Sequence, residues 1–509
     1  MTLGRPSDPG RAAFCGGCMG IEYMQAIPHE GVGENFEVPG AFTLQVRARL
    51  KEKGWAGLCF GLDGKTGWAM LANAYRREVH FLELKNNAVW LDRGLRRMDI
   101  IPGREVILRG EYDGKTLRVF FLDREDDPDP WPLFAFPLAL NGKAALYPGR
   151  NGAEFEDLRI SALEKPFYTG ETFVNPVIVG ADPDILLHDG RYYLYNRVPN
   201  DPKSTEDAYL YDGSDRAALD RAGDKNAVFR AASSTDLVHW SSYKTVFSRD
   251  ASLEGAFCMS PNVTEKDGWF YLFFAGGRFR GEENFHIYCA SSRSPLGPFT
   301  LKSASPIHAD TEEIGGMPFI DDDGQVYLSM VRFDRGNHIW LQKITLRDGI
   351  ALADREPARL ILSPEEEYEV DEYGRIAEGA VFIRHKGLYY MIYADGHYLG
   401  HYGESCAVAE NIFGPYTRQK NNPILHHHFM ADGTGDGIVI YNRDRTEMYM
   451  GYHRHVSVSD VEPRMTCIDR MRFVPDPGGG PDLLTVCGPS VTEQPLPFSG
   501  KSGARPNND

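Results

Sequence analysis

Two acidic residues in this sequence occupy matching places in a repeated phrase. Asp182 lies in Ala181-Asp182-Pro183 and Glu378 in Glu378-Gly379-Ala380, and a short apolar run follows each of them. Residues that head equivalent strands of a repeated fold converge on a common axis, so we expect the two carboxyl groups to meet. A desolvated carboxyl keeps its proton, whereas one with polar partners stays ionised. The pair is therefore suited to chemistry in which one group donates a proton and the other accepts one.

The repeated phrase is an apolar run, a turn with Gly or Asp, and a run rich in aromatic residues. Its copies begin at Ala181, Ser260, Met317, Glu378 and Gly437. Two such runs joined by such a turn are typical of a β-hairpin. A recurrence of about 55 to 80 residues is typical of propeller blades. The sequence therefore predicts an all-β fold that contains a five-bladed β-propeller around a central channel.

Strictly alternating apolar and polar residues fill the region from about residue 36 to residue 160. Examples are Phe42–Leu50, Val79–Leu84, Val106–Tyr112, Leu117–Leu122 and Ala153–Ile160. Such alternation predicts antiparallel sheets with one solvated face, and hence a β-sandwich. The last of these segments resembles the closing strand of the lectin-like, concanavalin-type sandwiches that accompany many carbohydrate-active enzymes.

These patterns predict the organisation of the chain. We expect a lectin-like β-sandwich over residues 1–165, a propeller over residues 170–498 and a disordered tail over residues 499–509. The sandwich would close one mouth of the channel and turn it into a pocket.

Composition excludes several classes of partner. The net charge of −17 argues against a nucleic-acid surface, since Lys and Arg clusters supply phosphate binding. No segment reaches the roughly 20 apolar residues of a membrane span. No apolar signal segment follows Met1, which predicts a cytoplasmic protein. Composition is compatible with a monomer and with an oligomer.

The propeller region resembles glycoside hydrolase family 43 within its five-bladed superfamily (families 43, 32, 68 and 117). The resemblance rests on an Asn-Pro opening, an Ala-Asp-Pro phrase, a Ser-Asp-Leu-Trp signature, a Glu-Gly phrase and a late Tyr-His phrase. In this sequence they are Asn175-Pro176, Ala181-Asp182-Pro183, Ser234 to Trp240, Glu378-Gly379 and Tyr452-His453.

The resemblance implies an inverting glycosidase that acts on a small oligosaccharide and requires no cofactor. Asp182 would be the general base that activates water, and Glu378 the general acid that protonates the leaving oxygen. The substrate would carry a terminal pentose or furanose sugar, as for an arabinofuranosidase or a β-xylosidase.

Two positions depart from the family pattern. A third acid, which tunes the general acid, is expected in the third blade, but Gly315 stands there. Glu313 is our preferred substitute, and Glu254 is the alternative. In the fifth blade the usual channel histidine is replaced by Asp436, which makes this residue a candidate ligand for a calcium ion in the channel.

Other residues near the blade entries are candidates for substrate binding: Glu254, Phe257 and His453. Two further functions remain open at this stage. One is a retaining, fructan-acting relative of the same superfamily. The other is a propeller that binds carbohydrate without catalysis, which the absence of an acid at Gly315 favours.

Overall fold

The computed structural model describes residues 35–85, 89–127, 129–149, 152–163, 167–168, 170–197, 227–249, 251–253, 256–277 and 285–497. Within these ranges the chain is all-β, as predicted, with two 3₁₀ turns at Ala251–Leu253 and Glu367–Glu369 and no α-helix. None of the described residues forms a helix that is long and apolar enough to cross a membrane. The predicted tail, Glu254 and the N-terminal residues lie outside the described ranges.

Alternating side chains build two packed sheets from the first part of the chain. One sheet has the order β1 (Asn35–Phe36), β10 (Lys143–Tyr147), β3 (Trp55–Leu62), β4 (Thr66–Asn73), β5 (Glu78–Lys85) and β6 (Val89–Arg97). The other has the order β11 (Ala153–Ala162), β2 (Phe42–Leu50), β7 (Glu105–Tyr112), β8 (Thr116–Leu122) and β9 (Phe134–Pro137). Apolar side chains of both sheets, among them Leu44, Leu58 and Leu108, are fully buried between them. The five segments predicted from alternation are all strands.

The second part of the chain forms five antiparallel sheets, one after the other. Sheet one holds β14 (Asp184–His188), β15 (Arg191–Arg197), β16 (Ala227–Ser234) and β17 (Lys244–Ser248). Sheet two holds β18 (Phe257–Lys266), β19 (Trp269–Gly277), β20 (His286–Ser292) and β21 (Thr300–Leu301). Sheet three holds β22 (Glu313–Ile320), β23 (Val326–Phe333), β24 (Asn337–Arg347), β25 (Ile350–Ala353) and β26 (Arg359–Leu362). Sheet four holds β29 (Ala377–His385), β30 (Leu388–Asp395), β31 (Gly403–Ala409) and β32 (Thr417–Arg418).

Sheet five closes these sheets into a ring. It joins β33 (Gly435–Tyr441), β34 (Met448–Arg454), β35 (Met465–Val474) and β36 (Leu483–Val486) to β13 (Ile178–Val179) from the start of the region. Next to this closure, β12 (Thr172–Phe173) pairs with β37 (Gln494–Pro495). The buried side chain of Asn175 donates to the carbonyl of Ile468 over 2.8 Å and accepts from the N–H of that residue over 3.0 Å.

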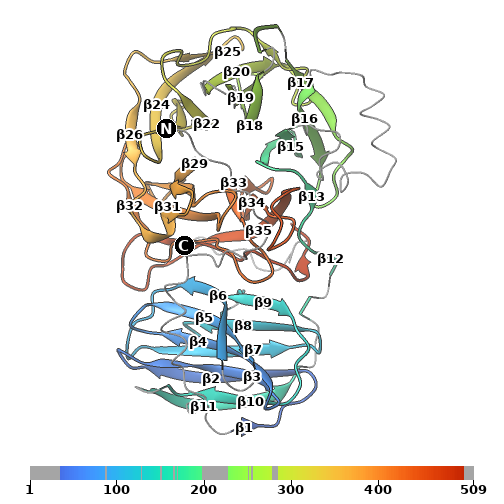
Figure 1. Cartoon of the computed structure of the whole chain (residues 1–509), viewed down its shortest axis with the longest axis vertical. Helices are drawn as coiled ribbons and strands as arrows, with labels where there is room; N and C mark the ends of the chain where they lie inside the picture. The colour runs from blue at the N-terminus through green and yellow to red at the C-terminus, as the bar shows by residue number, and fades with distance from the viewer. Residues whose placement is uncertain are drawn as a thin grey trace, which may run out of the picture.

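Each gap between neighbouring sheets is filled by an apolar cluster, including the gap between sheet five and sheet one. The second strand of each sheet contributes apolar side chains to the clusters on both sides of that sheet. Phe270, Leu272 and Phe274 pack towards sheet one, whereas Tyr271 and Phe273 pack towards sheet three. Burial on both faces explains the uninterrupted apolar runs of the repeated phrase. Figure 1 shows β18, β22, β29 and β33 bordering the centre of the ring.

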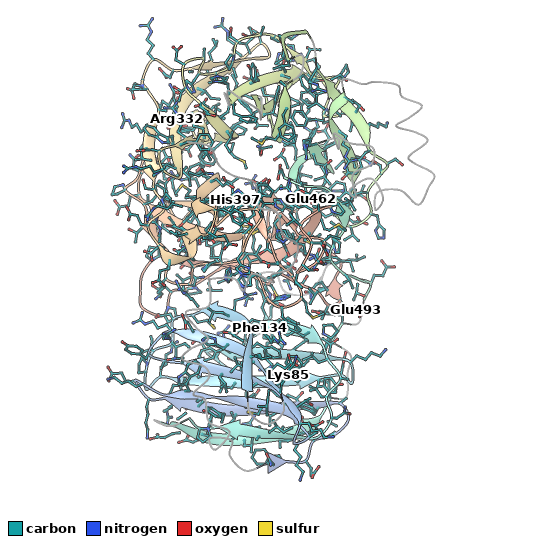
Figure 2. The ribbon with its side chains drawn as sticks, in the orientation of Figure 1. Lys85, Phe134, Arg332, His397, Glu462 and Glu493 are labelled. Atoms are coloured by element: carbon teal, nitrogen blue, oxygen red, sulfur yellow. The ribbon has the colours of Figure 1, made fainter. Side chains whose placement is uncertain are left out.

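The two N-terminal sheets lie beside the ring, next to sheet five, and not over its centre (Figure 1). The segment before β33 reaches into them. The Phe429 N–H donates to the carbonyl of Arg93 over 3.0 Å, and its ring lies 4.8 Å from that of Phe136 and 5.8 Å from that of Trp68. Phe134, labelled in Figure 2 at the end of the N-terminal sheets nearest the ring, belongs to the buried cluster against which Phe429 packs. The expectation that this region closes a channel mouth is therefore wrong.

Phe429 should hold the two parts together. We expect Phe429→Ala to lower the free energy of unfolding by about 2 kcal/mol, since a half-buried ring is lost from an aromatic cluster. Urea unfolding followed by tryptophan fluorescence checks this. Leu352→Ala is the matched control, because that side chain is exposed on β25 and should change stability by less than about 0.5 kcal/mol. Equal effects of the two substitutions would show that the segment does not anchor the sheets.

Candidate active site

A cavity of about 890 Å³ lies at the centre of the ring. Its size is in the usual range for sites that bind small molecules. The first strands of sheets two to five line it together with Asp182, the ends of neighbouring strands and adjacent loops, and none of its described lining residues comes from the two N-terminal sheets. His397 and Glu462 are on its wall, and Figure 2 labels both at the border of the central opening.

Five residues with left-handed backbone conformation ring this cavity, one from the entry of each sheet. They are Asp182 (φ 49°), Ser260 (φ 51°), Gly315 (φ 62°), Gly379 (φ 61°) and Asp436 (φ 56°). In sheets two to five this residue lies at a β-bulge, where the pairing with the next strand shifts. A bulge turns the side chain at this point towards the axis. We call these the five ring positions.

Asp182 is ionised because a buried arginine faces it. The Arg464 guanidinium donates from Nη1 to Oδ1 of Asp182 over 2.7 Å, and only 8% of Arg464 is exposed. Burial by itself raises the pKa of Asp182, but the charges of Arg464 and Arg197 outweigh it and hold this pKa below its ordinary value. The Asp182 N–H also donates to Nδ1 of His453 over 3.3 Å. Asp182 is therefore a carboxylate fixed at both its backbone and its side chain.

Glu378 has the opposite electrostatic environment. Burial raises the pKa of its carboxyl group, and the charge of Asp182 adds to this effect. The Tyr402 hydroxyl lies 2.8 Å from Oε1, and the Asn337 amide donates to Oε2 over 2.6 Å. These two contacts lower the pKa and fix the direction of the side chain without cancelling the effect of burial. Glu378 is thus the group of the pair that keeps its proton to higher pH.

Asp436 joins these two residues in the cavity. Its carboxyl oxygen lies within 4.8 Å of that of Asp182. Its Oδ1 lies only 3.0 Å from the point that a β-carbon on Gly379 would occupy. The structure therefore brings together the carboxyl groups of Asp182, Glu378 and Asp436.

The calcium ion expected at Asp436 does not fit this arrangement. Asp182, Asp436 and His453 offer ligand atoms that all lie within 4.8 Å of one another. Calcium prefers six to eight oxygen ligands, whereas one of these three residues offers a ring nitrogen. The Arg464 guanidinium lies 2.7 Å from Asp182 and 3.4 Å from Nε2 of His453. The arginine therefore already supplies the positive charge that a calcium ion would bring to these residues.

A second cluster with metal-binding side chains lies outside the cavity. It consists of His401, His427 and Asp432. The two imidazole rings stack with centroids 3.9 Å apart and planes 19° apart. His401 Nδ1 lies 3.0 Å from Oδ1 of Asp432, so the cluster is a stacked imidazole pair with a carboxylate partner.

Glu313, the preferred third acid, lies on the wrong face of its strand. Its side chain is completely buried and does not line the cavity. Oε2 accepts from Nε and Nη2 of Arg332 over 3.2 Å each, and Oε1 lies 2.7 Å from Nδ1 of His308. Arg332 is labelled in Figure 2 away from the central opening. This carboxylate is held by its own sheet and cannot tune Glu378.

The position of the missing third acid is open. A β-carbon on Gly315 would have only Val331 within 4 Å, at 3.5 Å. The cavity is therefore wider at Gly315 than it would be with an acidic side chain at this position.

The two described candidates for substrate binding have different places. Phe257 lines the cavity, and the guanidinium of Arg197 lies 4.8 Å from its ring centre. His453 is fully buried behind Asp182 and does not line the cavity, so the expected substrate contact is replaced by a contact with Asp182.

Sequence reasoning missed the groups that act on the two carboxyls: Arg464, Asn337 and Tyr402. Arg464 lies 282 residues after Asp182, in the loop before β35, and no motif marks it. A search for a cation to pair with a buried Asp182 is the signal that could have found it. No sequence motif indicated Tyr373 either. Its exposed ring lines the cavity and stacks on His397 with centroids 4.6 Å apart.

The family comparison agrees with this geometry. Residues 173–477 match the model of glycosyl hydrolases family 43. The chain belongs to this family. It is accordingly an O-glycosyl hydrolase, and the ring has the β-propeller fold of its family-43 structural neighbours.

Individual relatives are more distant. The chain is 24% identical over 318 residues to the β-D-galactofuranosidase XynD of Aspergillus niger, covering 59% of this chain and 82% of that protein. It is 28% identical over 205 residues to the arabinoxylan arabinofuranohydrolase of Paenibacillus polymyxa, covering 34% of this chain and 29% of that protein. A solved thermostable family-43 glycoside hydrolase superposes with a TM-score of 0.52 at 27% identity, covering 65% of this chain and 100% of that structure.

Removing the charge of Arg464 should change the pH dependence of this family-43 enzyme. In Arg464→Met the pKa of Asp182 rises, because burial is no longer opposed by the guanidinium. The acidic limb of the pH profile of kcat/KM then moves to higher pH, since Asp182 must be ionised to accept a proton. Loss of a hydrogen bond between charged groups should also lower kcat/KM at neutral pH by roughly 10- to 100-fold.

The control is Arg335→Met, which removes an arginine from the cavity rim whose side chain is 93% exposed. Its acidic limb should stay in place. An unmoved limb in Arg464→Met would show that Arg464 does not set the ionisation of Asp182.

Proposed function

We propose that this enzyme releases terminal pentose or furanose sugars from short oligosaccharides with inversion of configuration. One observation carries the proposal: the cavity holds two carboxyl groups whose environments move their pKa values in opposite directions. Pairs of this kind divide the roles of base and acid in glycoside hydrolysis.

In the proposed reaction Asp182 accepts a proton from a water molecule as that water attacks the anomeric carbon. The bond from this carbon to the glycosidic oxygen breaks, and Glu378 gives its proton to the leaving oxygen. The reaction ends with Asp182 protonated and Glu378 ionised, and one proton exchanged with solvent restores both groups. Arg464 keeps Asp182 ionised before each cycle, while Asn337 and Tyr402 hold Glu378 in position.

The choice of a pentose or furanose sugar is supported by the lining of the site and by the relatives. The cavity combines aromatic side chains, Phe257 and Tyr373 among them, with many charged and polar groups. Aromatic faces pack against the apolar faces of sugar rings. The relatives named above for galactofuranosides and for arabinoxylan favour furanosides. The open space at Gly315 would admit the longer exocyclic arm of a galactofuranose as well as a pentofuranose.

In this proposal the chain consists of a five-bladed propeller over residues 170–498 and a lectin-like β-sandwich over residues 1–165. The propeller carries the whole reaction. The two described N-terminal sheets stabilise it from the side and do not shape the sugar pocket, because none of their residues lines it.

A panel of aryl glycosides tests the function. We expect hydrolysis of at least one of the α-L-arabinofuranoside, β-D-galactofuranoside and β-D-xyloside, and none of the β-D-fructofuranoside. Proton NMR of the first product should show the anomer opposite to that of the substrate. A product with retained configuration, or hydrolysis of the fructoside alone, would contradict the proposal.

The two carboxyl groups should respond differently to substitution. Asp182→Asn should lower kcat by at least about 1,000-fold on every substrate, because no base remains to activate water. Glu378→Gln should lower kcat by about 100- to 10,000-fold on natural oligosaccharides but far less on dinitrophenyl glycosides, whose leaving group needs little protonation. Steady-state kinetics on both kinds of substrate measures this difference.

Matched controls are Asp189→Asn, at the exposed turn between β14 and β15, and Glu410→Gln, at the exposed turn after β31. Both should keep full activity. Equal losses of Glu378→Gln on good and poor leaving groups would remove the acid role from Glu378.

A further inference from the structure

The ring positions reveal where the third carboxyl of the site lies. The residues at these positions are Asp182, Ser260, Gly315, Gly379 and Asp436, so the fold offers one equivalent place per sheet. Sheets three and four leave their places empty, because Gly315 and Gly379 have no side chain. Sheet five fills its place with an acid.

Sheet five is next to sheet one in the ring, as the shared apolar cluster between β33 and β14 shows. The two ring positions that carry carboxyl groups are therefore neighbours, and their carboxyl oxygens lie within 4.8 Å of each other. Two carboxyl groups at this distance repel each other when both are ionised, and they can bond to each other only when one of them carries a proton.

We propose that Asp436 is a positioning residue that carries this proton and donates it in a hydrogen bond to the carboxylate of Asp182. It supplies from sheet five the third acid that sheet three lacks, and it acts on the base of the reaction. This inference rests on the proposed function of Asp182.

The charges around Asp436 decide which partner holds the proton. Asp182 has Arg464 at 2.7 Å, whereas no Lys, Arg or His of the described part of the chain forms an ion pair with Asp436, which faces the carboxyl groups of Asp182, Glu378 and Glu404. Burial raises the pKa of Asp436 well above its ordinary value, the charges of Asp182 and Glu378 raise it further, and the more distant Arg464 offsets only part of this. Two further titratable groups face Asp436. Tyr402 is neutral because burial raises its pKa, and His453 is neutral because burial lowers its pKa.

The surroundings of Asp436 fix its direction. The N–H of Gly437, the next residue of the bulge, donates to Oε1 of the buried Glu404 over 2.6 Å. Gly379 leaves room for Oδ1 of Asp436 at a point only 3.0 Å from where a β-carbon would be. Asp436 also keeps a left-handed backbone, which Asp and Asn accept more readily than other side chains do.

The test compares Asp436→Asn with Asp436→Gly. Asparagine keeps both the left-handed backbone and a neutral N–H donor to Asp182, so kcat should stay within about threefold of the wild type and both limbs of the pH profile should stay in place. Glycine keeps the backbone and removes the donor. Its kcat should fall roughly 10- to 100-fold, and its acidic limb should move to higher pH because the pKa of Asp182 rises.

Two results would overturn the proposal. A shift of the alkaline limb to lower pH in Asp436→Asn would show that Asp436 is ionised and acts on Glu378 by its charge. An Asp436→Gly enzyme with wild-type kcat and pH profile would show that Asp182 needs no donor. Thermal unfolding of both variants checks that they are folded.

A second readout does not depend on hydrolysis. The infrared band of protonated carboxyl groups, recorded near neutral pH, should be weaker in Asp436→Asn than in the wild type by the contribution of one group. An unchanged band would contradict a protonated Asp436 whatever the enzyme hydrolyses. An inactive wild type with the expected band loss would instead contradict the proposed function and leave the protonation of Asp436 established.

Discussion

A guanidinium and a carboxylate that are buried side by side set the chemistry of the central cavity. Removing a carboxylate from water is unfavourable unless a partner compensates for the lost hydration. Arg464 is that partner for Asp182, at 2.7 Å, and it serves neither Glu378 nor Asp436 to the same degree. One arginine thus divides three neighbouring carboxyl groups into one ionised group and two groups that hold their protons more strongly.

The ring construction is what makes this division possible. Each sheet contributes one left-handed residue to the cavity, and in sheets two to five a bulge at that residue turns it towards the axis. The apolar clusters between the sheets fix the distances between these positions, and the pairing of β13 with β35 closes the ring. Residues far apart in sequence, such as Asp182 and Arg464, are therefore held as rigidly as neighbours.

Sequence alone was sufficient for the parts of this account that depend on local repetition. The strands of both regions follow from their alternation, and Asp182, Glu378 and Phe257 follow from their places at the blade entries. Glu313 was misplaced for a physical reason. Neighbouring side chains of a strand point to opposite faces, and the bulge follows Ile314, so Ile314 lines the cavity while Glu313 faces Arg332. Asp436 was recognised as a channel residue, but its neighbours, which argue against calcium, come from other sheets.

The central claim is that Asp182 is ionised while Glu378 keeps its proton in the resting enzyme. Neutron diffraction from deuterated crystals, grown at the pH of maximal kcat/KM, tests it most directly because deuterium positions are seen and need not be inferred. The account predicts a deuteron on a carboxyl oxygen of Glu378 and none on either oxygen of Asp182. A deuterated Asp182 beside Arg464, or a Glu378 without deuterium, would contradict it.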